Sequence, residues 1–312
     1  MANATVNRFG AKNGDTDKTE LFLKVFGGEV MAAFDEANVT SDKHVIRSIA
    51  SGKSAQFPAT WKVTASYHTP GAEIVGQTSN VSERVITIDD LLMADVFLAN
   101  IDEAMSHFDV RSEYSKQCGL VLANKMDTNV LQVGVLAARA SATVSGGNGG
   151  YTSTSATTLY KTSASDLAAG IYLAMQNFDE KDIPEGDEKF CFVKPAQYYL
   201  LAQSTALINR DWMGQGSYGD GKIIRIGGSP IVKTNHLPTT NVASGPSAYQ
   251  GDFTKTAALL MTRRAVGTVK LLDLAMEMAY DIRRQGTLMV AKYAVGHGIL
   301  MPECAAELKT TS

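Results

Sequence analysis

Residues 109–140 read DVRSEYSKQCGLVLANKMDTNVLQVGVLAARA and contain no proline. One set of residues in this stretch recurs at steps of three or four: Tyr114, Cys118, Leu122, Met126, Val130, Val133 and Ala137. That spacing keeps their side chains on one face of a helix with 3.6 residues per turn. Such a helix would be roughly 45 Å long at 1.5 Å per residue, far longer than an average globular helix. The pattern therefore predicts one long amphipathic helix that spans a subunit.

The segment from Phe57 to Ile88 has a period of two instead. Every second residue from Trp61 to Tyr67 is apolar, Pro70-Gly71 interrupts the chain, and a second extended run follows at 81–88. This order predicts a long β-hairpin. A two-stranded ribbon is only marginally stable in water by itself. We therefore expect the hairpin to lie on another surface, either its own domain or a neighbouring molecule.

The first 18 residues are polar and glycine-containing, which is typical of a mobile arm. A second periodic run then begins near Thr19, with apolar residues at four-residue steps: Phe22, Phe26, Val30 and Phe34. It predicts an amphipathic helix, which Gly27 and Gly28 weaken by about 1 kcal/mol each. Such a helix needs a surface for its phenylalanines. Packing within the subunit and docking on another subunit both remain open.

The rest of the chain predicts an α+β architecture. Residues 89–107 are helix-prone and lead into the long helix, whereas the Gly- and Ser-rich segment 141–158 predicts a flexible connector. A second α+β domain, inserted into the first, is expected between residues 163 and 262. Within it we expect helices at 166–178 and 195–203, strands at 190–193, 223–226, 231–234 and 257–261, and a glycine-rich loop at 214–221. Two further strands, at 268–279 and 287–295, would pair alongside the long helix and close the first domain.

Composition and charge exclude several functional classes. The chain has 29 Lys and Arg against 32 Asp and Glu, a formal charge of −3, which gives no strong attraction to nucleic acids or acidic membranes. Cys118, Cys191 and Cys304 are odd in number and far apart, which argues against a disulfide framework and fits a reducing cytosol. The sequence shows neither a membrane-length apolar run nor a signal peptide. We therefore expect a cytoplasmic site of synthesis and assembly.

No motif points to catalysis, a cofactor or a metal. Gly52-Lys53-Ser54 resembles the end of a phosphate-binding loop, but Arg47 stands where that loop needs glycine, so a turn before the hairpin fits better. The glycines of 214–221 lack the strand and helix that flank a dinucleotide fingerprint. The five histidines are at least 24 residues apart and form no zinc motif. Cys118 lies on the apolar face of the long helix, where a packed thiol is expected. Two alternatives stay open: a homo-oligomeric intracellular enzyme with an unrecognised site, and a nucleic-acid-binding protein.

The predicted parts share one property, because each of them is incomplete alone. A loose arm, a glycine-weakened aromatic helix, a long hairpin and a long helix all leave surface uncovered. Such parts fit together if the missing partners are further copies of the same chain.

Several long runs of residues resemble a known family. The runs are LFLKVFGGEV at 21–30, HVIRSIASGKSAQFP at 44–58, RVITIDDLLMADVFLANIDEAMSHFDVRSEYS at 84–115, RRAVGTVKLLDLAMEMA at 263–279 and AKYAVGHGILMPE at 291–303. They closely resemble the major capsid protein of T-seven-like short-tailed bacteriophages. The resemblance covers about the first 140 and the last 50 residues, and the middle of the chain, 141–262, is not matched.

The resemblance implies the α+β fold of Hong Kong-97-like capsid proteins. It implies an N-terminal arm at residues 1–54 and an extended hairpin, the E-loop, at 55–88. A peripheral domain is expected at 89–145 and 263–312, with a spine helix at 109–140. An axial domain is expected at 146–262, with its tips meeting at the centres of hexamers and pentamers.

The same resemblance implies a structural role in the virion. Copies would form the hexamers and pentamers of an icosahedral shell around double-stranded DNA, after assembly in the bacterial cytoplasm. The implied partners are a scaffolding protein, a portal protein and the packaged DNA. A separate scaffolding protein is expected because no long helical segment precedes the arm. A near-neutral inner wall suits DNA that must enter and leave. The Lys–Asn crosslink of some relatives is not expected here.

The sequence also suggests residues for subunit contacts: Phe22, Phe26, Lys53, Trp61, Glu83, Arg84, Arg263 and Arg264. For each of them an intramolecular or solvated role stays open. A contact role for Trp61 predicts that Trp61→Ala impairs shell formation more than subunit folding. Equal loss of both would make Trp61 a core residue.

Overall fold

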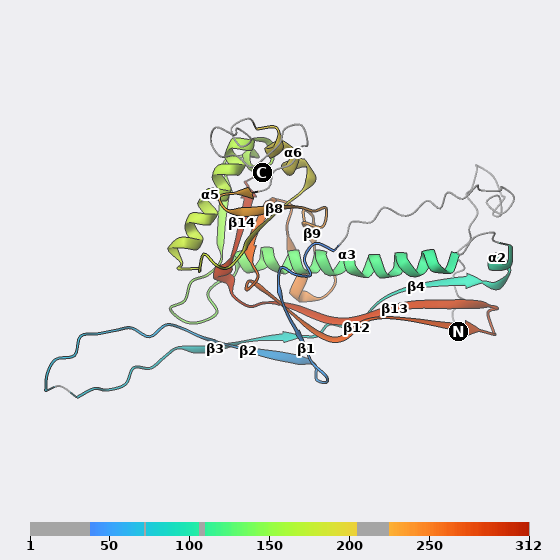
Figure 1. Ribbon diagram of the computed structural model, residues 1–312, viewed down its shortest axis with the longest axis horizontal. Coiled ribbons are helices and arrows are strands. Elements are labelled where there is room, and N and C mark those ends of the chain that lie inside the picture. Colours follow the sequence, from blue (N-terminus) through green and yellow to red (C-terminus); the bar gives the residue numbers. More distant parts are fainter. Residues whose placement is uncertain (1–37, 72, 106–109, 205–224, 312) are drawn as a thin grey trace. The chain divides into compact units, whose positions relative to one another are not determined.

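The computed structural model describes residues 38–71, 73–105, 110–204 and 225–311 (Figure 1). The aromatic helix expected from Thr19, with Phe22 and Phe26, lies outside the described residues, as does the glycine-rich loop 214–221. The chain divides into two compact units. The first contains Asp89–Met126 and Leu272–Val295, and the second contains Asn38–Ile88, Asp127–Leu271 and the residues from Gly296 onward.

The long helix is α3, which runs from Val110 to Arg139 and so confirms the helix expected at 109–140. Its amphipathic pattern holds only for part of its length. Cys118 and Leu122 are buried while Val121 is 54% exposed, but every residue from Val130 to Val135 is buried. A helix that is buried all round lies inside a core. Gly134 marks a close approach there, because a methyl group at this position would lie 2.8 Å from Leu259 and 3.2 Å from the sulfur of Met261.

The first unit is built on an antiparallel sheet. Strand β4 (Leu92–Ala99) pairs with β13 (Gly286–Ile299), from Ala99 opposite Gly286 to Leu92 opposite Tyr293. The core contains Leu98 and Met289, with Val96 and Tyr114 packed against them. The helix expected over 89–107 is therefore wrong for residues 92–99. Of the described residues in that range, only α2 (Asn100–Met105) is helical, and 106–109 lie outside the described residues. Cross-strand pairing outweighs the helical propensity of Leu, Met and Ala in this strand.

Strand β12 (Val266–Asp281) lies beside β13 in a sheet of order β1-β12-β13-β4. Strand β1 (Val45–Ser48) pairs in parallel with the start of β12, from Gly267 to Lys270. Beyond that point, no described strand pairs with the outer edge of β12. The strands expected at 268–279 and 287–295 are confirmed by β12 and β13.

The second unit contains a six-stranded sheet of order β5-β14-β11-β6-β8-β7. These strands are β5 (Tyr151–Ser155), β6 (Lys189–Val193), β7 (Arg225–Ile226), β8 (Ser229–Lys233), β11 (Thr256–Thr262) and β14 (Ala305–Thr310). The other elements are α4 (Leu159–Thr162), α5 (Ala164–Glu180), α6 (Pro195–Ala202), β9 (Asn241–Val242), β10 (Gly251–Asp252), and the 3-10 helices η2 (Ser247–Tyr249) and η3 (Pro302–Cys304).

Most elements expected in this part of the chain are confirmed, including both helices and the strands at 190–193, 231–234 and 257–261. Of the strand expected at 223–226, residues 225 and 226 form β7, and the others lie outside the described residues. The flexible connector expected at 141–158 is wrong in its second half. There Tyr151–Ser155 forms β5, which pairs in parallel with β14.

A partly buried ion pair links α3 to the six-stranded sheet. The Arg139 guanidinium donates to both carboxylate oxygens of Glu307, each at 2.6 Å, and Glu307 is fully buried. A third donor to Glu307 is the Thr256 hydroxyl at 2.7 Å. Hydrogen bonding to Glu307 raises the pKa of Arg139. Because a two-pronged pair has a fixed geometry, this contact sets the position of the end of the helix.

Strands β2 (Ser54–Thr60) and β3 (Val81–Thr87) form the expected hairpin. They are antiparallel, with Ser54 opposite Thr87 and Thr60 opposite Val81. The alternating run from Trp61 to Tyr67 was expected to continue the first strand, but the ladder ends before it. In the described part of 61–80, no residue is assigned to a strand. Its side chains are mostly exposed, so no packed face stabilises further pairing.

All three cysteines are free and buried. Burial raises the pKa of Cys118, that of Cys191 to about 12 and that of Cys304 to about 11. The described residues include no helix that is long and apolar enough to cross a membrane.

Candidate functional site

The described residues contain no cluster of metal-ligating side chains. The hairpin carries large apolar side chains that almost nothing covers. Tyr67 is fully exposed, Ile74 and Val75 are each 80% exposed, and Val63 is 69% exposed. Exposed apolar groups gathered in one segment are typical of an interaction surface.

A second uncovered surface lies along β12 in the first unit. Met278 is 64% exposed, Tyr280 is 50% exposed, and the residues between Glu277 and Tyr280 are all exposed. Successive strand residues point to opposite faces, so residues 277–280 of this strand are uncovered on both faces. A long apolar edge strand is a template for pairing with another chain.

The base of the hairpin is attached to the short loop that follows α3. The Trp61 ring lies near Gly146 and Gly147, and a methyl group at Gly147 would lie 3.5 Å from it. The Asn80 amide donates to the Ser145 carbonyl at 2.8 Å. Arg84 donates through Nε to the Thr143 hydroxyl at 3.1 Å. In addition, Lys62 pairs with Asp182 at 2.9 Å, with both side chains largely exposed.

The structure places the contact residues suggested by the sequence in two groups. Trp61 and Arg84 both lie at the hairpin base, against the loop 143–147. Lys53 and Glu83 belong to the same hairpin region and are exposed. The second group is Arg263, which donates to the His44 carbonyl at 3.4 Å, and Arg264, which pairs with Asp187 at 3.2 Å.

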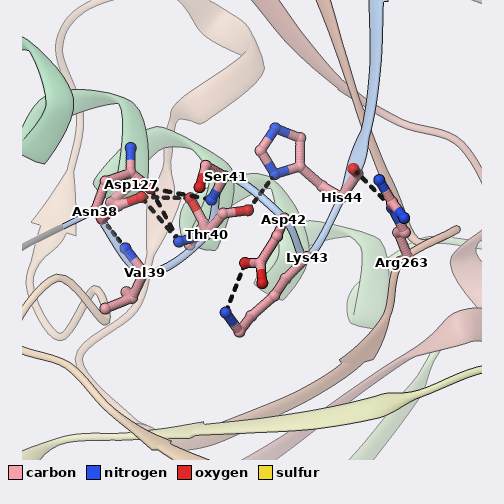
Figure 2. Close-up of polar contacts among 9 residues, drawn as sticks. All are labelled: Asn38, Val39, Thr40, Ser41, Asp42, Lys43, His44, Asp127 and Arg263. Atoms are coloured by element: carbon pink, nitrogen blue, oxygen red, sulfur yellow. Dashed lines mark hydrogen bonds and ion pairs between the residues drawn. The ribbon is translucent and has the colours of Figure 1, made fainter.

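A buried polar cluster joins residues 38–44 to the middle of α3, as Figure 2 shows. The fully buried Asp127 carboxylate accepts hydrogen bonds from the backbone amides of Val39 at 2.9 Å and Thr40 at 3.2 Å, and from the Thr40 hydroxyl. The Asn38 side chain accepts from the amides of Thr40 and Ser41, which shapes the turn. We call this arrangement the Asp127 clasp.

Two buried histidines lie beside this clasp. His44 Nδ1 donates to the Thr40 carbonyl at 2.6 Å, and burial lowers the pKa of His44 to about 4. His297 Nδ1 is 2.8 Å from the Thr268 hydroxyl, and burial lowers its pKa to about 3. Both imidazoles are therefore neutral at pH 7. The sequence analysis missed this cluster, although one signal was available: Asp127 is a charged residue between Met126 and Val130, both of which are buried in α3.

These elements together define a class of protein. The capsid structure of the cyanophage P-SCSP1u is similar with a TM-score of 0.85 and 40% identity, and the match covers 100% of both chains. The fold is thus that of a bacteriophage capsid protein, of the Hong Kong-97-like α+β type.

The comparison with relatives narrows the class to a family. The chain is 35% identical to the major capsid protein of Escherichia phage T7, over 93% of this chain and 91% of that protein. It is 33% identical to the major capsid protein of Enterobacteria phage T3, over 96% of this chain and 94% of that protein. Residues 56–309 match the family model of Gp10A-like major capsid proteins, and the chain belongs to this family. The family is structural, so the enzyme alternative is not supported.

Proposed function

We propose that copies of this chain form the hexamers and pentamers of an icosahedral shell around the double-stranded DNA of a phage. The observation that carries the proposal is the uncovered hairpin, with Val63, Tyr67, Ile74 and Val75 in water. Isolated two-stranded ribbons are marginally stable, and a neighbouring subunit would bury these side chains. Membership of a major capsid protein family supports the same assembly.

The chain offers two different surfaces for contacts between copies. The hairpin and the exposed residues 277–280 of β12 differ in sequence and structure. A contact between the hairpin of one copy and β12 of another is therefore heterologous. Heterologous contacts build closed rings when the rotation between neighbours closes, whereas a surface that pairs with itself builds dimers. Two unlike surfaces therefore support rings of five and six subunits. Among the suggested contact residues, Lys53 and Glu83 are exposed on the hairpin side and remain candidates for this role.

The division into capsid domains is also part of the proposal: an arm at 1–54, an E-loop at 55–88, a peripheral domain at 89–145 and 263–312, and an axial domain at 146–262. Support comes from the hairpin, whose two strands fall within or beside the E-loop bounds, and from β4 and β13, which belong to the peripheral segments. The six-stranded sheet draws strands from both larger domains, because β14 pairs with β11.

Assembly in the host cytoplasm is proposed to involve a scaffolding protein and a portal protein. Contact with the packaged DNA is proposed to be non-specific. The formal charge of −3 supports this, since a strongly basic wall would hold DNA tightly. The free, buried cysteines are compatible with synthesis in a reducing compartment.

The test is to express the chain together with a scaffolding protein of the same phage and to examine the product by electron microscopy. We expect closed shells of uniform size. A compact monomer that stays stable under every assembly condition would contradict the proposal. Salt-dependent, tight binding of DNA by the unassembled subunit would instead favour a nucleic-acid-binding protein.

A further inference from the structure

We propose that the loop 143–147, which we call the seat, holds the base of the hairpin and sets the direction in which the hairpin points. This inference rests on the proposed function, in which the hairpin contacts a neighbouring subunit. It assigns Trp61, Asn80 and Arg84 to positioning the hairpin within their own subunit. Their partners in the seat are Gly147, Ser145 and Thr143.

The contacts come from both limbs of the hairpin, which are the segments before and after the turn at Pro70-Gly71. Trp61 lies on the first limb, and Asn80 and Arg84 lie on the second. The Trp61 amide also donates to the Asn80 carbonyl at 3.0 Å, which continues the hairpin by one step beyond the strand pair Thr60 and Val81. The two limbs are thus fixed to one loop at the point where their strand pairing ends.

The seat is built for close approach. Gly146 has a φ of +85°, a backbone conformation that favours glycine, and a methyl group on Gly147 would lie 3.0 Å from the Val144 carbonyl. These glycines let the indole ring lie near the backbone. The Lys62–Asp182 pair adds little, because side chains that are 66% and 77% exposed pair weakly in water.

The seat is important for assembly because a small rotation at the base of the hairpin causes a large displacement of its tip. Beyond Trp61 and Asn80 each limb has roughly ten residues, which span about 30 Å when extended. A rotation of about 10° at the base would then move the tip by about 5 Å, enough to displace Tyr67 and Val75 from a packed interface. Between these limbs, the amide and hydroxyl of Thr64 donate hydrogen bonds to the Gln77 side chain. These bonds hold the limbs to each other and not to the rest of the subunit.

The test uses the fluorescence of Trp61 in the full-length chain. The protein has two tryptophans, so Trp212→Phe leaves Trp61 as the only one. In this background, Arg84→Ala and Thr143→Val each remove the same hydrogen bond, one from the hairpin and one from the seat, and Asn80→Ala removes another. Gln176→Ala is the matched control, because it deletes an exposed amide that bonds Glu180 on α5 and removes none of the hydrogen bonds between hairpin and seat.

Two measurements are made on the unassembled subunit. Acrylamide quenching of Trp61 should rise in the three seat variants and not in Gln176→Ala. Hydrogen exchange of the amides of 54–60 and 81–87 should accelerate about fivefold, the effect of one net hydrogen bond on an opening equilibrium. The effects of Arg84→Ala and Thr143→Val should add only in part, since both remove the Arg84–Thr143 bond and Thr143→Val also removes the bond to the Leu300 carbonyl. The unfolding midpoint of the six-stranded sheet should not change.

Shell formation is then scored by electron microscopy. We expect the seat variants to give fewer or malformed shells, and Gln176→Ala to assemble normally. Unchanged quenching and exchange in the seat variants would overturn the proposal, as would a loosened hairpin that still builds normal shells. If the unsubstituted chain builds no shell, the proposed function fails, and the quenching and exchange results still decide whether the seat holds the hairpin.

Discussion

At the scale of single residues, the Asp127 clasp shows how one buried charge can fix a chain segment. Its carboxylate is fully buried and is stabilised by three hydrogen-bond donors from Val39 and Thr40. Buried polar networks specify a unique arrangement when they are satisfied and are costly when they are broken. The clasp therefore fixes the point at which residues 38–44 join α3.

Replacing the carboxylate tests this role. Asp127→Ala should lower the free energy of unfolding by about 3 kcal/mol, because it leaves buried donors without an acceptor. Urea unfolding of the unassembled subunit measures the loss, and hydrogen exchange should locate it in residues 38–44. The control is Asp90→Ala, at an exposed position, which should change stability by less than about 0.5 kcal/mol. Equal stability of the two variants would show that the clasp contributes nothing.

The buried histidines predict acid sensitivity. The folded-state pKa of His44, about 4, lies below the ordinary value of 6.5, so the unfolded chain binds more protons between these pH values. Stability is therefore complete above about pH 6.5 and falls by about 1.4 kcal/mol per pH unit toward pH 4 for this residue. Burial is the main cause, and the positive charges of Lys270 and Arg263 act in the same direction.

The pH dependence is checked by urea unfolding at pH 7, 5.5 and 4.5. His44→Gln should reduce the slope of stability against pH in this window, even if it lowers stability at pH 7. His68→Gln, at an exposed position of the hairpin, should leave the slope unchanged. An unaltered slope in His44→Gln would show that His44 is not protonated on unfolding in this range.

At the scale of elements, the sequence predicted those whose pattern is local. The period of α3 and the alternation of the hairpin depend on neighbouring residues, and both elements are present. Leu92–Ala99 was expected to be helical, because its Leu, Met and Ala favour helices, but its pairing with β13 is decided nearly 200 residues away. The polar β5 is likewise a strand because β14 lies beside it. Asp127 was missed for the same reason, since its partners Val39 and Thr40 are 88 and 87 residues away in sequence.

The turn between α3 and β5 gives a prediction at this scale. A methyl group at Gly150 would lie 2.3 Å from the Ala137 carbonyl and 2.4 Å from that of Ala138, and backbone atoms cannot move aside easily. Gly150→Ala should therefore destabilise the subunit by about 3 kcal/mol or prevent soluble expression. Gly186→Ala is the control, because its methyl group would meet nothing within 4 Å. The unfolding midpoints of the two variants provide the comparison, and similar midpoints would contradict the close contact.

At the scale of the whole molecule, the described residues leave apolar surface uncovered at the hairpin and along 277–280 of β12, and the sequence already indicated that the parts of the chain were incomplete. It could not show which residues would face solvent. Tyr67, for example, was one of an alternating set, yet it lies beyond the end of the strand pairing and is fully exposed. Burial depends on what lies opposite a residue, and in a shell that is another subunit.

The uncovered hairpin predicts a separation between folding and assembly. The double variant Tyr67→Ser and Val75→Ser should fold with a stability within about 0.5 kcal/mol of the unsubstituted chain, because both side chains are exposed in the subunit. Its yield of shells, counted by electron microscopy, should fall strongly. Val121→Ser, at a 54% exposed position on α3, is the control and should assemble. Normal shells from the double variant would remove the hairpin tip from the interface.

The three cysteines have a consequence for the particle after it leaves the cell. A released phage passes from a reducing interior into an oxidising medium. Thiolates are the reactive form of cysteine, and burial keeps the three thiols of each subunit protonated and shielded. The wall should therefore gain no disulfide links on release, and its durability should be the same with and without dithiothreitol.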